Sequence, residues 1–86
     1  MHAHVVTVDF TDVEAAIKGL DELVPNVKAA TGFVAGYWIR LDDSHGTSIA
    51  VFETEDQARG VAPPVGGEMD GVKITSVQVG QVMGSA

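Results

Sequence analysis

The segment from Phe33 to Leu41 is apolar on both of its faces, and this constrains the fold more than any other feature of the chain. Its side chains alternate with the period of two that is typical of a β-strand. One face would carry Phe33, Ala35, Tyr37, Ile39 and Leu41, and the other Val34, Gly36, Trp38 and Arg40. A turn over residues 42–46 and a second apolar strand over residues 47–53 would complete a hairpin. Both faces of the resulting sheet therefore need cover.

A further strand and a helix are predicted before this hairpin. A Val-rich segment over residues 3–10 has the composition of a strand. Thr11 and Glu14 have the spacing of a capping box, in which both side chains satisfy free amides at a helix start. Pro25 would disrupt or kink this helix, and Gly32 would end its continuation. One apolar stripe at helical spacing would be buried, formed by Val13, Ala16, Ile17, Leu20 and Leu23.

The C-terminal third predicts a short helix, a loop and a last strand. Residues 54–57 form a second capping box, and the helix it opens would include Ala58 and Val61 and stop at a Pro pair, residues 63–64. Residues 63–71 are then expected to be a loop. The final strand, residues 72–82, shifts its apolar phase between Ile74 and Val77, as a β-bulge or burial on both faces would require.

This order of elements predicts a single α+β domain of the ferredoxin-like βαββαβ class, with a four-stranded antiparallel sheet and two helices on one face. The other face would be bare. Four strands of about six residues present roughly 400 Å² of projected surface, near the largest apolar patch that monomers tolerate. Hydrophobic residues make up 45% of the 86-residue chain and charged residues only 20%, more apolar than a lone small domain needs. We therefore expect a homodimer that pairs through its sheet faces.

Charge and residue usage restrict the partners and the compartment. The chain carries twelve acidic and five basic residues, a net charge of −7, so its field repels phosphate backbones and anionic lipid headgroups. Nucleic-acid and membrane partners are therefore not expected. No cysteine is present, which excludes disulfides, thiolate metal sites and cysteine nucleophiles, and fits a reducing cytoplasm. No segment has the length of a membrane span or the pattern of a signal peptide, and we expect a cytoplasmic protein.

A further pattern is formed by a Gly-Phe pair at residues 32–33, Gly36 and Arg40 in the second strand, and residues 52–55 with Ala58 at the second helix. In these residues the chain resembles the dimeric α/β-barrel superfamily, in particular its small proteins similar to antibiotic-biosynthesis monooxygenases (ABM-like). The resemblance implies a homodimer of two packed sheets, with a pocket between sheet and helices in each protomer. Members include cofactor-independent oxygenases, haem-degrading enzymes and proteins of unknown role, so the resemblance does not assign a reaction.

The haem-degrading members use an Asn on the first strand, a Trp on the second helix and a haem-ligating His near it. The corresponding stretches here hold Val6 and Thr7, and Gly60 and Val61, and no histidine follows His45. Haem degradation by that mechanism is therefore not expected, and we expect no cofactor.

Four residues are candidates for a catalytic site: His4, Tyr37, Trp38 and Arg40. They would suit a cofactor-independent monooxygenase or isomerase acting on a small aromatic or polyketide-like substrate, with His4 as a base and Arg40 on a carboxylate or phenolate. The alternative is a non-catalytic binding or accessory module. In that case the aromatic residues fill a core or an interface, and Arg40 pairs with an acidic residue across the dimer. Both hypotheses leave a small protein with an apolar pocket of unassigned role.

No metal motif is recognisable, and we expect no metal. His2 and His4 would lie about 7 Å apart on one strand face, but strand lengths place His45 some 20 Å away. Five acidic residues should gather at the hairpin-turn end of the sheet, as solvated turn residues or as a rim for a cation or a basic partner: Asp9, Asp42, Asp43, Glu68 and Asp70. The Gly pair at residues 66–67 would let the 63–71 loop act as a lid.

Overall fold

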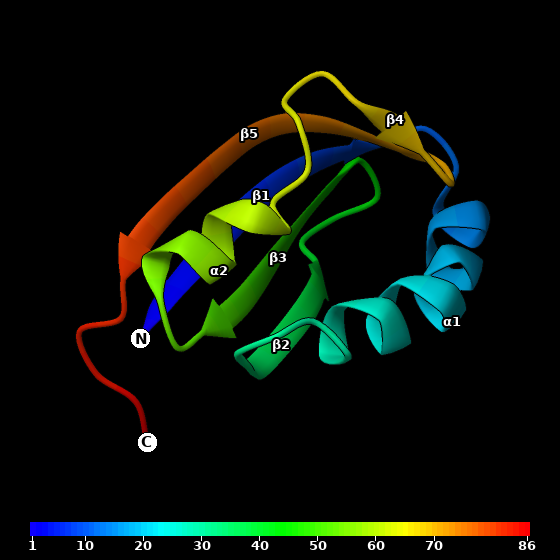
Figure 1. The fold of residues 1–86 in the computed structure, drawn as a ribbon. Coiled ribbons are helices and arrows are strands. Elements are labelled where there is room, and N and C mark those ends of the chain that lie inside the picture. Colours follow the sequence, from blue (N-terminus) through cyan, green and yellow to red (C-terminus); the bar gives the residue numbers. More distant parts are fainter.

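The computed structural model describes residues 1–86 and contains one antiparallel sheet of five strands and two helices. The strands are β1 (His2–Phe10), β2 (Phe33–Arg40), β3 (His45–Phe52), β4 (Glu68–Met69) and β5 (Val72–Gln81), and the helices are α1 (Val13–Lys28) and α2 (Glu55–Gly60). The strand order β2-β3-β1-β5-β4 places β1 at the centre. The sheet is curled, α2 packs within the curve against β1, β3 and β5, and α1 lies beside β2 (Figure 1). Neither helix is long and apolar enough to cross a membrane.

The predicted four-stranded ferredoxin-like fold, with two helices on one face, is wrong, and so is the dimeric α/β-barrel fold built on it. The fifth strand arises in the segment predicted as a loop. Asp70 and Gly71 have positive φ angles of 44° and 77°, the combination that closes a two-residue hairpin. This turn pairs β4 with the start of β5. The helix α1 also departs from the prediction, because it buries none of its side chains.

The start of α1 lies one residue later than the predicted capping box. The amides of Thr11 and Asp12 both donate to the carbonyl oxygen of Gly71, at 2.7 and 3.1 Å. Thr11 is therefore held outside the helix by the β4–β5 turn. Asp12 caps the helix in its place, accepting from the Ala15 amide at 3.1 Å. The helix then continues through Pro25 to Lys28.

The capping box predicted for α2 is confirmed. The amide of Gln57 donates to the Thr54 hydroxyl at 3.2 Å, and the Thr54 amide donates to the Gln57 side chain at 3.1 Å. The helix ends at Gly60, before the Pro pair at residues 63–64. The helix therefore ends before the proline pair, which does not itself terminate it.

Two bulges set which side chains face the helices. The bulge predicted in the last strand is confirmed, because the β1–β5 register shifts between Thr7 and Val8 and leaves Thr75 without a partner on β1. A second bulge in β2 was not predicted. There Phe33 pairs with Phe52, and the next pair begins at Ala35. Phe33 therefore faces the helices, not the opposite face with Tyr37.

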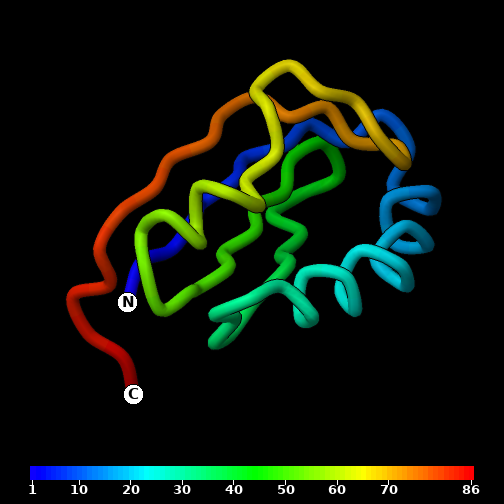
Figure 2. Tube along the Cα trace, in the orientation of Figure 1, coloured from blue at the N-terminus to red at the C-terminus, as the bar shows by residue number.

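One cluster of buried residues lies at one end of the molecule. Ala50, Phe52 and Ala58 form its centre, and Phe33 meets Phe52 edge-on with 5.9 Å between ring centroids. Both chain ends lie at this end, where the Val82 amide donates to the Met1 carbonyl oxygen (Figure 2). Only eight of the 86 residues are buried, and α1 contributes none of them. The space between α1 and the other end of the sheet is therefore not filled by packed side chains.

Candidate functional site

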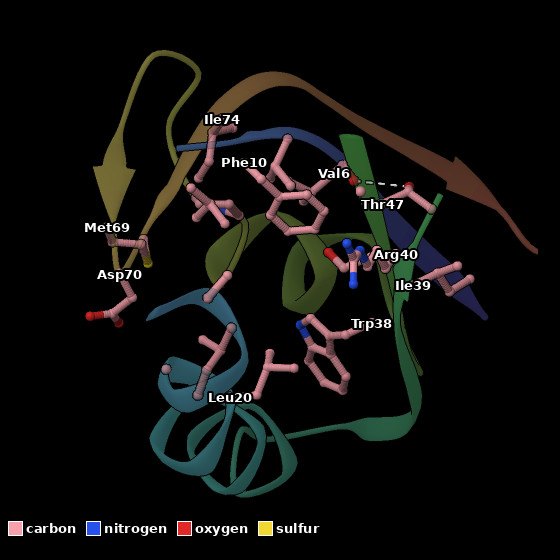
Figure 3. A pocket seen from close by; sticks show the side chains of 18 of the residues that line it. Val6, Phe10, Leu20, Trp38, Ile39, Arg40, Thr47, Met69, Asp70 and Ile74 are labelled. Carbon is pink, nitrogen blue, oxygen red and sulfur yellow. Dashed lines mark hydrogen bonds between the residues drawn. The ribbon is translucent and has the colours of Figure 1, made fainter. Parts of the chain in front are cut away.

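A cavity of about 480 Å³ lies between α1 and the face of the sheet that carries the core. Fifteen of the 23 residues that line it are hydrophobic, so its walls are mainly apolar (Figure 3). Close-packed interiors contain few voids larger than a water molecule. This hollow is much larger than such a void and is partly open to solvent.

One wall of the cavity is the apolar stripe of α1. The residues that the sequence predicts to be buried all line the cavity: Val13, Ala16, Ile17, Leu20 and Leu23. None of them is buried, and Ile17 is 59% exposed. The helix is tethered at both ends: the Gly71 carbonyl oxygen accepts from the Thr11 and Asp12 amides just before its start, and a short connection joins its end to β2 at Phe33. The tethers keep the stripe over the sheet, at a distance that leaves the space between them open.

The sheet forms the floor of the cavity. Val6, Val8 and Phe10 alternate along β1 toward the same face, and Val72 and Ile74 of β5 lie beside them. Gly46 of β3 leaves room for the Phe10 ring, because a β-carbon there would lie 2.6 Å from it. The floor is therefore apolar along the central strands.

The segment between α2 and β4 closes a further side of the cavity. Val61, Pro63, Pro64 and Met69 all line it. The segment is hydrogen-bonded to β5, because the Gly66 amide donates to the Ile74 carbonyl and the Ile74 amide donates to the Gly67 carbonyl, at 2.8 and 2.9 Å. Val61 and Met69 remain 40% and 43% exposed, so the cavity is open to solvent on this side.

Polar groups line the cavity where β2 and β3 meet. Trp38 and Arg40 lie on one face of β2, and Ser48 of β3 pairs directly with Trp38. Arg40 donates from Nη2 to Asp43 Oδ1 at 2.6 Å and from Nε to the Asp42 carbonyl oxygen at 3.4 Å. Figure 3 shows the Arg40 guanidinium and the Trp38 indole nitrogen on one side of the cavity, with Asp70 on the other side and pointing away from it.

The four predicted catalytic residues do not form one site. Trp38 and Arg40 line the cavity, as described. His4 is buried in the core, where its Nδ1 donates to the Ala58 carbonyl oxygen at 3.0 Å and its ring packs on Phe52. Tyr37 lies on the opposite face of the sheet and is 61% exposed. The structure therefore brings Trp38 and Arg40 together and separates them from His4 and Tyr37.

Two parts of the site were not predicted from the sequence: Ser48 and the wall formed by residues 61–69. Ser48 stands in an apolar strand with no motif around it, and only the strand register places it beside Trp38. The wall depends on the β4–β5 hairpin. An Asp-Gly dipeptide between apolar residues is a strong hairpin signal, and residues 70–71 carry it.

The acidic residues of the hairpin turn are held by local contacts. Asp42 Oδ1 accepts from the amides of Ser44 and His45 at 2.7 Å and from the His45 ring at 3.0 Å. The Ser44 amide first, then the His45 side chain, lower the pKa of the Asp42 carboxyl. Asp9 lies 3.7 Å from the other nitrogen of the His45 ring.

The remaining titratable candidates stand apart from this turn. Glu68 is exposed, and Asp70 packs on Gly19 of α1, where a β-carbon would lie 2.7 Å from it. His2 keeps a buried Nδ1 without a hydrogen-bond partner. No group of three or more His, Asp or Glu side chains is placed to hold a metal ion.

No family model, curated protein or solved structure matches this chain. The resemblance to ABM-like proteins therefore stays a prediction from the sequence.

Proposed function

We propose that this protein binds a small apolar molecule in the cavity between α1 and the sheet. The observation that carries the proposal is the cavity itself, which has apolar walls and a volume of about 480 Å³. Small-molecule sites occupy roughly 300–1,000 Å³ and are lined mainly by hydrophobic side chains with a few polar groups. The cavity matches this description in size and in lining.

The incomplete burial of the α1 stripe supports a ligand over a plain core. Leu20 and Leu23 present apolar surface to this space without being buried. Burying apolar surface contributes roughly 25 cal/mol per Å². A ligand that filled the space would supply the contacts that α1 lacks, whereas an accessory module without a ligand gives no reason for the hollow.

Binding is favoured over catalysis by the polar groups that line the cavity. The candidate base, His4, lies in the core with its Nδ1 engaged by Ala58, and neither His2 nor His45 lines the cavity. Arg40, Trp38 and Ser48 are groups that bind and orient, since none is an ordinary general base near neutral pH. We therefore place binding before the monooxygenase or isomerase alternative.

Titration with N-phenyl-1-naphthylamine, an uncharged probe that fluoresces in apolar surroundings, tests the proposal. Trp38 is the only tryptophan of the chain and lines the cavity, so its emission should fall by energy transfer as the probe binds. We expect saturation at one probe per chain. Tyr37→Ser, on the opposite face, should leave the titration unchanged. Absence of saturable binding, or its loss in Tyr37→Ser, would refute the cavity as the site.

The opposite face of the sheet supports the homodimer as a second part of the proposal. Tyr37, Ile39 and Leu41 there are 61%, 42% and 60% exposed, and Val5, Ile49 and Val51 continue the apolar surface across β1 and β3. A second copy would cover it by two-fold symmetry. Sedimentation velocity at micromolar concentration should give twice the 9.0 kDa chain mass, and Tyr37→Ser should weaken the association. A single 9.0 kDa species would refute the dimer without touching the cavity.

A cytoplasmic location completes the proposal. It rests on the absence of cysteine, which fits a reducing compartment.

A further inference from the structure

The cavity has a polar end, built by three residues on neighbouring strands. Trp38 and Ser48 are directly paired across β2 and β3, and Arg40 follows Trp38 on the same face. All three line the cavity. Their free groups are hydrogen-bond donors: the indole N–H, the serine hydroxyl and the guanidinium N–H groups.

These donors have capacity to spare. Arg40 has five N–H donors. Only two hydrogen bonds engage them within the protein, from Nη2 to Asp43 Oδ1 and from Nε to the Asp42 carbonyl oxygen. The side chains of Trp38 and Ser48 form no hydrogen bond within the protein, and neither is buried. The polar end therefore presents at least two unused donors and one cation to whatever fills the cavity.

The ion pair of Arg40 is of the kind that a ligand can replace. The side chains of Arg40 and Asp43 are 50% and 95% exposed. Exposed ion pairs contribute little to stability, since water screens them and both side chains lose freedom. A carboxylate reaching Arg40 from the apolar side would form its hydrogen bonds in a less polar setting, where they are stronger.

Charge is distributed unevenly around the cavity. Arg40 is the only basic residue that lines it, and Asp70, the only acidic one, lies across from it with its carboxylate turned outward (Figure 3). The whole chain carries a net charge of −7, which repels anions. A preference for an anion must therefore come from this polar end and not from the overall field.

We infer that the ligand is an amphipathic carboxylate whose head is bound by Arg40, Trp38 and Ser48 and whose apolar chain lies along α1. The planar guanidinium matches a carboxylate with two parallel hydrogen bonds, which an alcohol or an amine cannot accept. The apolar walls, including Leu20 and Ile74, suit a hydrocarbon chain. This inference rests on the proposed function and adds the chemical class of the ligand.

Competition with N-phenyl-1-naphthylamine at pH 7.5 tests the inference, using three probes of equal chain length: decanoate, decanol and decylamine. We expect decanoate to displace the dye at about tenfold lower concentration than decanol, the lower end of what a charged hydrogen bond contributes. Equal displacement by decanoate and decanol, or tighter binding of decylamine, would overturn the inference while leaving the apolar site in place. If the dye itself does not bind, the proposed function fails as well.

Matched variants locate the head group. Arg40→Gln should remove the preference, so that decanoate and decanol displace the dye at similar concentrations. Arg59→Gln is the control, because Arg59 forms a similar exposed ion pair with Glu55 at 3.0 Å but does not line the cavity. Asp43→Asn should strengthen decanoate binding by releasing Arg40. A preference for decanoate that survives Arg40→Gln, or that falls equally in Arg59→Gln, would contradict the assignment of Arg40.

Discussion

His4 Nδ1 lies 3.0 Å from the carbonyl oxygen of Ala58, and this hydrogen bond joins the central strand to α2. The imidazole is almost completely buried, and its centroid lies 5.7 Å from that of Phe52. A residue that the sequence offers as a catalytic base is thus a structural contact of the core. His4 does not line the cavity.

His4→Ala should lower the free energy of unfolding by about 2–3 kcal/mol, because it removes a buried hydrogen bond and leaves a void beside Phe52. Urea unfolding measures this loss. The folded variant should bind N-phenyl-1-naphthylamine with unchanged affinity. An unchanged stability would contradict the structural role of His4. A folded variant that no longer binds the dye would restore His4 as a site residue.

Gly71→Ala should destabilise the protein by about 2 kcal/mol or more. Alanine at its φ of 77° costs roughly 1–2 kcal/mol, and the β-carbon would also collide with the Asp12 carbonyl oxygen. Gly66→Ala is the matched control, because Gly66 has a φ of 86° with open space around it and should show the backbone cost alone. Equal losses in urea unfolding of the two variants would mean that contact with the start of α1 does not matter.

Asp42 should contribute to the fall of stability in acid. Its amide and His45 contacts lower the pKa of the folded state below the ordinary value of 3.8. The ionised carboxylate therefore stabilises the fold, fully above that value, and the contribution is lost as the pH falls through the lowered pKa. Urea unfolding at pH 6 and pH 2.5 should show a smaller difference in Asp42→Asn than in the parent. Identical pH dependence in both proteins would count against this contact.

Ala16→Leu should fill part of the cavity from α1. The added methylene groups meet apolar walls, so the variant should be at least as stable as the parent, by roughly 0.8 kcal/mol per group that becomes buried. Its affinity for N-phenyl-1-naphthylamine should fall severalfold in fluorescence titration. Ala29→Leu, at the exposed end of α1 and outside the cavity, is the control. Unchanged binding in Ala16→Leu would show that the dye lies elsewhere.

Local patterns predicted the elements well. The capping box at Thr54, the apolar stripe of α1 and the bulge in β5 all follow from nearest-neighbour chemistry, which a single sequence displays. The cap of α1 was misplaced by one residue because the Gly71 carbonyl, sixty residues away along the chain, holds Thr11. A contact between residues so far apart in the sequence produces no recognisable pattern in the residues around Thr11.

The fold and the site were harder to predict for the same reason. The prediction assumed that the amphipathic helix α1 packs its apolar stripe directly onto the sheet. In the structure, the tethers at the two ends of α1 leave a cavity between the helix and the sheet. The bulge at Val34 reversed the face of Phe33, which strict alternation could not show. Trp38 and Arg40 were predicted together, since they share a face of one strand, but Ser48 joined them only through the register of two strands.

Isotope-filtered NOE spectroscopy of the labelled protein with unlabelled decanol tests the central claim most directly. Protons of the bound chain should show NOEs to Leu20 on α1, to Ile74 on β5 and to the Trp38 indole, which surround the cavity from three elements. NOEs to Tyr37 and Ile49 alone, which pair on the opposite face and do not line the cavity, or none at saturating decanol, would contradict a ligand site between α1 and the sheet.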